Sequence, residues 1–126
     1  MSVQLNHTIV WCRDKKRSAS FLAELLERPE PTAFGPFLVV ELDNDVSLDF
    51  YERDGAILLQ HYAFLISEEE FERAFEKVRA RGLSYWADPG KSRPGEVDTH
   101  DGGRRIYFDD PDNHLLEIMT RKYEVA

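Results

Sequence analysis

Hydrophobic and polar positions along the chain follow two periods, and the same order of periods occurs twice. In the first half, a stretch rich in β-branched and aromatic residues is followed by apolar residues at helical spacing behind Asp14, a candidate N-cap. Two further apolar stretches flank the polar turn at residues 43–45, which is typical of a hairpin. The elements predicted for this half are a strand at 4–12, a helix that stops before Pro29, and strands at 37–42 and 46–52.

The second half repeats this order. Ser67 and Glu70 form a capping box, Phe71 opens an apolar stripe at helical spacing, and Gly82 is a natural residue to end the helix. Proline and glycine residues between 88 and 103 predict a long loop, a kind of segment that often forms a lid or a binding loop. The predicted elements are a strand at 59–66, a helix at 67–81, a short strand at 83–87, and a hairpin at 105–108 and 115–120.

The chain is therefore predicted to run strand, helix, strand, strand, twice, with room for one further short strand in each half. Sequence identity between the halves is faint, so the order of the elements carries the inference. One repeat occupies about residues 3–54 and the other about residues 57–122, within a single domain that spans residues 1–126.

Size and cysteine content narrow the class of protein. The 126 residues, of which 42% are hydrophobic, suffice for a core without disulfides. No apolar run approaches the roughly 20 residues that span a bilayer, and no secretory signal pattern is visible at the N-terminus. Cys12 is the only cysteine, which excludes an intrachain disulfide and makes a reducing cytoplasm the simplest location. We expect Cys12 to be a packed core thiol.

The formal net charge of −8 argues against nucleic acid or an anionic membrane as the main partner. A small-molecule substrate is the expected partner. A small anion remains compatible with the charge, because a local arginine or metal ion can override the global field.

Four potential metal ligands lie in the most apolar segments: His7, Asp49, His61 and Glu117. Neutral imidazole and carboxylate are standard ligands of divalent metals, and two histidines with one carboxylate leave positions open for substrate or oxygen. Each strand histidine is also compatible with a structural role. Glu117 is costly to bury without a partner, although it shares a strand face with Leu115 and would tolerate solvent there.

Three segments carry a family resemblance. Residues 103–118 (GRRIYFDDPDNHLLEI), 5–9 (LNHTI) and 60–64 (QHYAF) resemble the vicinal oxygen chelate superfamily, which contains glyoxalase I, fosfomycin-resistance enzymes, extradiol dioxygenases and bleomycin-resistance proteins. The resemblance implies an α+β fold in which two βαβββ modules form a cupped, open mixed sheet around a metal. It also implies a homodimer, the usual form of small members.

By this resemblance His7, His61 and Glu117 are the metal ligands, and Glu117 is the catalytic carboxylate. Asp49 aligns with Glu117 and is a fourth ligand if its shorter side chain reaches the metal; otherwise it would orient a bound water or a histidine. The expected cofactor is one divalent ion, with manganese, iron, zinc and nickel all compatible with these ligands.

Several other residues are candidates for substrate binding, each with a plainer alternative. Arg105 would bind an anionic oxygen and Tyr107 would donate a hydrogen bond, unless both lie on the outer face of their strand. Trp86 and Phe50 would supply an aromatic wall, although aromatic residues on strands often belong to the core. His100 would act from the long loop, where exposure to solvent is the alternative. We expect a further histidine, His114, to lie at the surface.

The resemblance leaves two main functions open. The first is a metal-dependent enzyme that chelates a small oxygenated substrate, with a glyoxalase-like lyase, isomerase or transferase preferred over a dioxygenase. The alternative is a non-catalytic protein that binds a small molecule such as a bleomycin-type antibiotic, and a third possibility is a relic without metal. Retention of His7, His61 and Glu117 favours the enzyme.

Overall fold

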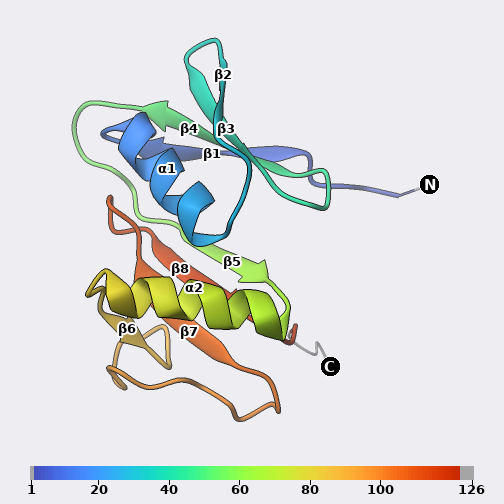
Figure 1. The fold of residues 1–126 in the computed structure, drawn as a ribbon. Helices are drawn as coiled ribbons and strands as arrows, with labels where there is room; N and C mark the ends of the chain where they lie inside the picture. Colours follow the sequence, from blue (N-terminus) through green and yellow to red (C-terminus); the bar gives the residue numbers. More distant parts are fainter. Residues whose placement is uncertain (1, 123–126) are drawn as a thin grey trace. The chain divides into compact units, whose positions relative to one another are not determined.

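The computed structural model describes residues 2–122, which form two compact units that divide between Leu58 and Leu59 (Figure 1). Each unit contains one helix and one four-stranded mixed sheet. The first unit holds β1 (His7–Cys12), α1 (Lys15–Leu25), β2 (Thr32–Phe34), β3 (Phe37–Glu41) and β4 (Ser47–Glu52). The second holds β5 (His61–Leu65), α2 (Glu68–Ala80), β6 (Tyr85–Trp86), β7 (Arg105–Asp109) and β8 (Leu115–Met119).

The first sheet has the strand order β1-β4-β3-β2, with β1 parallel to β4 and the other pairs antiparallel. Helix α1 begins where the side chain of Asp14 accepts a hydrogen bond from the backbone N–H of Arg17, as expected of an N-cap. The helix packs on β3 and β4 and covers one sheet face (Figure 1). The buried residues of the sheet are Val10, Cys12, Val40, Leu48 and Phe50.

The second sheet has the order β5-β8-β7-β6, with β5 parallel to β8. Both hydrogen bonds of the predicted capping box between Ser67 and Glu70 are present at the start of α2. Gly82 follows the helix at φ +67°, a backbone conformation that glycine adopts without strain. On the buried side of α2, the ring of Phe75 meets that of Tyr85 edge-on at 5.1 Å.

The two units share one strand register, which confirms the internal repeat. In the first unit Asp49 pairs with Ile9 of β1 and Val39 of β3. In the second unit Glu117 pairs with Ala63 of β5 and Tyr107 of β7. Since Ile9 and Ala63 each lie two residues after the opening histidine, histidine and carboxylate share one sheet face in both units.

The predicted elements are confirmed, and most are shorter than the patterns suggested. The stretch at 83–87 contributes only Tyr85–Trp86, and the additional strand expected in the first half is Thr32–Phe34. Cys12 is fully buried, as expected for a core thiol. Among residues 2–122, no helix has both the length and the apolar character needed to cross a membrane.

Candidate metal centre in two half-sites

The half-site of the second unit consists of His61 and Glu117 on the adjacent strands β5 and β8. The imidazole Nε2 lies 3.0 Å from the Oε1 of Glu117, and the Nδ1 lies 2.9 Å from the backbone carbonyl of Leu115. Because a carbonyl only accepts, the Nδ1 of His61 carries a hydrogen, and in the neutral tautomer the Nε2 lone pair faces Glu117. In that tautomer Nε2 and Oε1 are both available as metal ligands.

Arg105 holds the other oxygen of Glu117. Its Nε lies 2.7 Å from Oε2, and both side chains are inside the protein, with exposed fractions of 5% for Arg105 and 0% for Glu117. The guanidinium also lies 3.8 Å from the carboxylate of Asp98 and 3.4 Å from that of Asp101. Glu117 therefore has one oxygen toward a cationic side chain and one toward His61, whose side chain is 45% exposed.

The loop carboxylates around Arg105 are held in their charged form. Burial raises the pKa of Asp98, but hydrogen bonds from the side chain and backbone of His100 outweigh this and leave that pKa below its ordinary value. For Asp101, the hydrogen bond from the backbone N–H of Gly103 and then the charge of Arg105 lower the pKa. The long loop thus surrounds Arg105 with negative charge.

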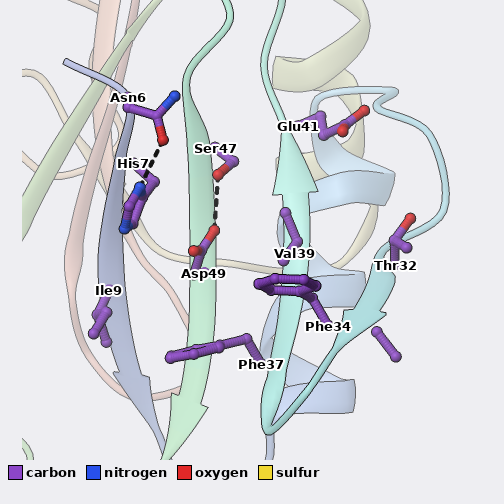
Figure 2. Close-up of a pocket in the computed structure, with 11 residues that line it drawn as sticks. Asn6, His7, Ile9, Thr32, Phe34, Phe37, Val39, Glu41, Ser47 and Asp49 are labelled. Carbon is purple, nitrogen blue, oxygen red and sulfur yellow. Dashed lines mark hydrogen bonds between the residues drawn. The ribbon is translucent and has the colours of Figure 1, made fainter.

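The half-site of the first unit consists of His7 and Asp49, which line a pocket of about 440 Å³ (Figure 2). The Nδ1 of His7 lies 2.7 Å from the side-chain oxygen of Asn6, so this histidine, like His61, has its Nε2 available as a ligand. The hydroxyl of Ser47 donates to the Oδ1 of Asp49 at 2.8 Å. Figure 2 shows His7 and Asp49 extending from neighbouring strands toward the same space.

The pocket is apolar and acidic. Its wall includes Phe34, Phe37 and Val39, and its charged members are Glu41 and Asp49 beside His7. Neither lysine nor arginine is among the residues that line it. Such a surface suits a ring system that carries no negative charge.

The residues of both half-sites fit a divalent metal by their donor chemistry. Each histidine has its Nδ1 hydrogen-bonded to an oxygen, the arrangement that fixes metal-ligating histidines in the correct tautomer. Over residues 2–122, however, no three His, Cys, Asp or Glu side chains gather at one point. The structure pairs His61 with Glu117 and places His7 and Asp49 on one pocket, so the complete ligand set stays a prediction.

The predicted substrate-binding residues occupy different environments. Tyr107 is buried on the face of Glu117, with its ring stacked on His61 at 6.0 Å between centroids. Trp86 lies on β6 under the ammonium group of Lys91, 4.6 Å from the ring centre. His100 is 70% exposed and bound to Asp98.

Two of these candidates, Phe50 and Arg105, are buried among other side chains. Phe50 is buried on the helix-covered face, because strand residues alternate and its neighbour Asp49 faces the pocket. Arg105 faces three carboxylates rather than an open surface, so its charge is already matched.

His114 is fully buried, so its predicted surface position is wrong. Its Nδ1 accepts a hydrogen bond from the backbone N–H of Gln60, and its backbone N–H donates to the Oδ1 of Asp110. The turn before it passes through Asn113 at φ +70°, which brings the histidine ring inward against Tyr62. Burial raises the pKa of Asp110. Sequence reasoning missed this buried turn, although the dense run of turn residues before His114 was a signal for it.

Fold and half-sites define a class: an α+β protein of two βαβββ modules, each with a histidine and a carboxylate on one sheet face. The model of the Glyoxalase/Bleomycin resistance protein/Dioxygenase superfamily matches residues 4–118. The chain belongs to this superfamily, which confirms the resemblance seen in its sequence.

Individual relatives narrow the class to enzymes. The chain is 55% identical to the solved structure of Oxidase ChaP-H1, with a TM-score of 0.96, and the match covers 98% of this chain and 100% of the other. It is 32% identical to Metallothiol transferase FosB from Lysinibacillus sphaericus (strain C3-41), over 95% of this chain and 84% of the relative.

A more distant neighbour shares the fold. It is a mutant of FosX from Listeria monocytogenes with Mn(II) and 1S,2S-dihydroxypropylphosphonic acid, 24% identical, with a TM-score of 0.72 and 98% and 94% coverage.

Proposed function

We propose that the chain is a metal-dependent oxidase that passes electrons from a hydroxylated aromatic substrate to dioxygen. The observation that carries this proposal is the 55% identity to Oxidase ChaP-H1 over nearly the whole of both chains. The donor set adds support, because two histidines and one carboxylate with open positions are typical of non-haem iron oxygenases. This proposal favours the oxidative branch of the superfamily over the lyase and transferase branches.

In this proposal His7, His61 and Glu117 hold the metal. A redox-active divalent ion such as iron or manganese would supply both electron transfer to dioxygen and Lewis acidity toward the substrate. Zinc is redox-inert and would supply only the Lewis acidity. The carbonyl of Leu115 and the side chain of Asn6 keep the two imidazoles in the ligating tautomer.

Asp49 is a candidate proton acceptor in this scheme. It lines the pocket, and Ser47 already occupies its Oδ1, which orients the carboxylate and leaves Oδ2 for a substrate hydroxyl. Its carboxylate is one methylene shorter than that of Glu117, which holds the corresponding strand position, so it extends less far from the sheet.

The pocket supports an aromatic substrate without negative charge. Phe34 and Phe37 offer ring faces, while Glu41 and Asp49 would repel an anion. A volume of about 440 Å³ lies within the range that accommodates small organic ligands.

The proposal is tested with protein purified without a histidine tag and reconstituted under argon with Fe(II) or Mn(II). Oxygen uptake and peroxide release are followed with a panel of catechols, hydroquinones and hydroxynaphthoquinones. We expect metal-dependent oxygen uptake with at least one member, and its loss in His61→Ala. Binding of less than a tenth of an equivalent of any divalent metal refutes the enzyme. Tight binding of an aromatic ligand by such metal-free protein instead supports the non-catalytic alternative.

A thiol transferase is the second candidate, favoured by the 32% identity to Metallothiol transferase FosB. The phosphonate group of the ligand in the FosX structure is an anion, whereas the pocket of this chain is lined by two carboxylates and no cation. We therefore expect no consumption of cysteine or glutathione in the presence of fosfomycin and Mn(II). Turnover of fosfomycin would reverse the order of the two candidates.

A further inference from the structure

We propose that Arg105 is the positioning residue of the metal centre, which fixes the carboxylate of Glu117 so that only Oε1 is offered to the metal. The inference rests on the proposed metal site and extends it, because it assigns the ligand mode of Glu117 to a residue of the neighbouring strand. Arg105 acts through Glu117 and touches neither substrate nor metal.

Geometry supports this division of the two oxygens. The Nε of Arg105 lies 2.7 Å from Oε2, while the Nε2 of His61 lies 3.0 Å from Oε1. An ion pair with a guanidinium at one oxygen restricts the rotamer of the buried carboxylate side chain. Oε1 is then the oxygen that lies beside the Nε2 of His61.

The guanidinium of Arg105 is also held by groups other than Glu117. Asp98 and Asp101 of the long loop lie 3.8 and 3.4 Å from its two terminal nitrogens, and the carbonyl of Arg121 lies 3.4 Å away. Only 5% of the Arg105 side chain is exposed, so the cation is not a surface group that happens to reach inward. A chain of contacts thus runs from the loop through Arg105 to Glu117.

The internal repeat provides a built-in comparison. Arg105 lies two residues before Tyr107, which pairs with Glu117. In the first unit, Phe37 lies two residues before Val39, which pairs with Asp49. The first unit therefore has an aromatic ring where the second has a cation. Asp49 is held by the neutral hydroxyl of Ser47 instead. Of the two carboxylates, Glu117, which we propose as a metal ligand, is the one that the cation accompanies.

Neighbouring residues supply a matched control. Arg104 precedes Arg105 and points to the other side of the strand, where it binds Glu68 and Glu72 of α2 and covers the ring of Phe71. Replacing either arginine by methionine removes one positive charge and one set of carboxylate contacts. Of these two arginines, Arg105 is the one that contacts Glu117.

The experiment measures Mn(II) affinity by calorimetry in the wild type, Arg105→Met, Arg105→Lys and Arg104→Met, each checked for folding by circular dichroism. We expect Arg105→Met to weaken Mn(II) binding by about 10- to 100-fold, the usual effect of losing a partner of a metal ligand. Arg105→Lys should weaken it less, because lysine keeps the charge and loses the planar fork. Arg104→Met should stay within about two-fold of the wild type.

A spectroscopic readout separates positioning from general loosening. At saturating Mn(II), the electron paramagnetic resonance spectrum of Arg105→Met should differ from that of the wild type, since release of Oε2 changes how Glu117 binds. Arg104→Met should keep the wild-type spectrum.

The outcomes distinguish the two proposals. If the wild type binds no Mn(II), the metal centre is refuted and the role of Arg105 falls with it. If the wild type binds and Arg105→Met binds within two-fold or more tightly with the same spectrum, only the role of Arg105 is refuted. If Arg105→Met does not fold, Arg105→Lys decides: unchanged affinity and spectrum overturn the proposal, and weaker binding with an altered spectrum supports it.

Discussion

The two half-sites have the same strand register and opposite characters. In the first unit, Asp49 and His7 line an open pocket among aromatic side chains. In the second, Glu117 is fully buried between Arg105 and His61. The half-site of the first unit thus lies at a pocket, whereas the carboxylate of the second is enclosed by protein side chains.

This difference follows from a few substitutions on a shared framework. Where the first unit has Ser47 and Phe37, the corresponding positions of the second have Leu115 and Arg105. The first unit has an aromatic ring that lines the pocket at the position where the second has the cation of an ion-pair cluster. The positions at which the two copies of the repeat have different residues are therefore the ones that distinguish the two half-sites.

The largest expected effect is on stability. Glu117→Ala removes the carboxylate that lies nearest the buried cation of Arg105, and we expect it to lower the free energy of unfolding of the metal-free protein by about 3 to 5 kcal/mol. Asp49→Ala, at a half-buried site, should cost about 1 kcal/mol or less. Urea unfolding in the presence of chelator measures both. Equal losses would show that the two carboxylates are structurally equivalent.

Metal affinity should separate the same two carboxylates. We expect Glu117→Gln to weaken Mn(II) binding by about 100-fold or more, because it removes a ligand rather than a partner of a ligand. Asp49→Asn should weaken it by less than about five-fold if Asp49 serves the substrate. Calorimetry gives both constants, and a large loss in Asp49→Asn would make Asp49 the fourth ligand after all.

The pocket wall should affect ligand binding and leave the metal untouched. Phe37→Ala removes a ring that lies 5.0 Å from that of Tyr51 and lines the pocket. We expect it to weaken binding of a hydroxynaphthoquinone probe by about ten-fold, the loss of roughly one aromatic contact, with Mn(II) affinity unchanged. Quenching of tryptophan fluorescence measures binding of the probe. A matched surface change, Lys77→Ala on α2, is expected to alter neither quantity.

The smallest expected effect contrasts the two hairpin turns. Burial raises the pKa of Asp110, so the folded protein binds this proton more tightly than the unfolded chain does. The contribution of Asp110 to stability is therefore present below the ordinary carboxyl pKa and is lost as pH rises through the raised folded value. Asp110→Asn keeps the Oδ1 acceptor for His114 and should flatten this part of the pH profile, with a gain of about 1 kcal/mol or less at pH 7.

Asp43 provides the control for this pH effect. It lies in the corresponding turn of the first unit, 80% exposed and paired with Arg28 at 2.9 Å. Asp43→Asn should leave the dependence of stability on pH nearly unchanged. Thermal melts from pH 3 to pH 7 test the contrast, and identical profiles for both variants would remove the role assigned to burial of Asp110.

Much of the fold could be predicted from the sequence because its signals are local. The cap at Asp14, the capping box at Ser67 and the two hairpin turns each depend on a few adjacent residues. The repeat and the opening histidines follow from the order of these elements. Strand alternation would also have placed Phe50 on the sheet face away from Asp49, since adjacent strand residues point to opposite faces.

The environment of Glu117 could not be predicted in the same way. Strand β7 is buried on both faces, so alternation of polar and apolar residues does not show which side faces the site. The burial of Arg105 depends on Asp98 and Asp101, which reach it from a loop with no periodic pattern. His114 likewise turns inward through the backbone conformation of Asn113, which side-chain type alone does not specify.

One hydrogen bond links the chemistry of the site to the accuracy of folding. The tautomer of His61 depends on the carbonyl of Leu115, which lies opposite it only when β5 and β8 pair in the native register. A slip of one residue would turn Glu117 to the helix side and remove that carbonyl from the imidazole. If the proposed metal site is correct, a chain with the wrong strand register would not take up the ion, and metal uptake would report native strand pairing.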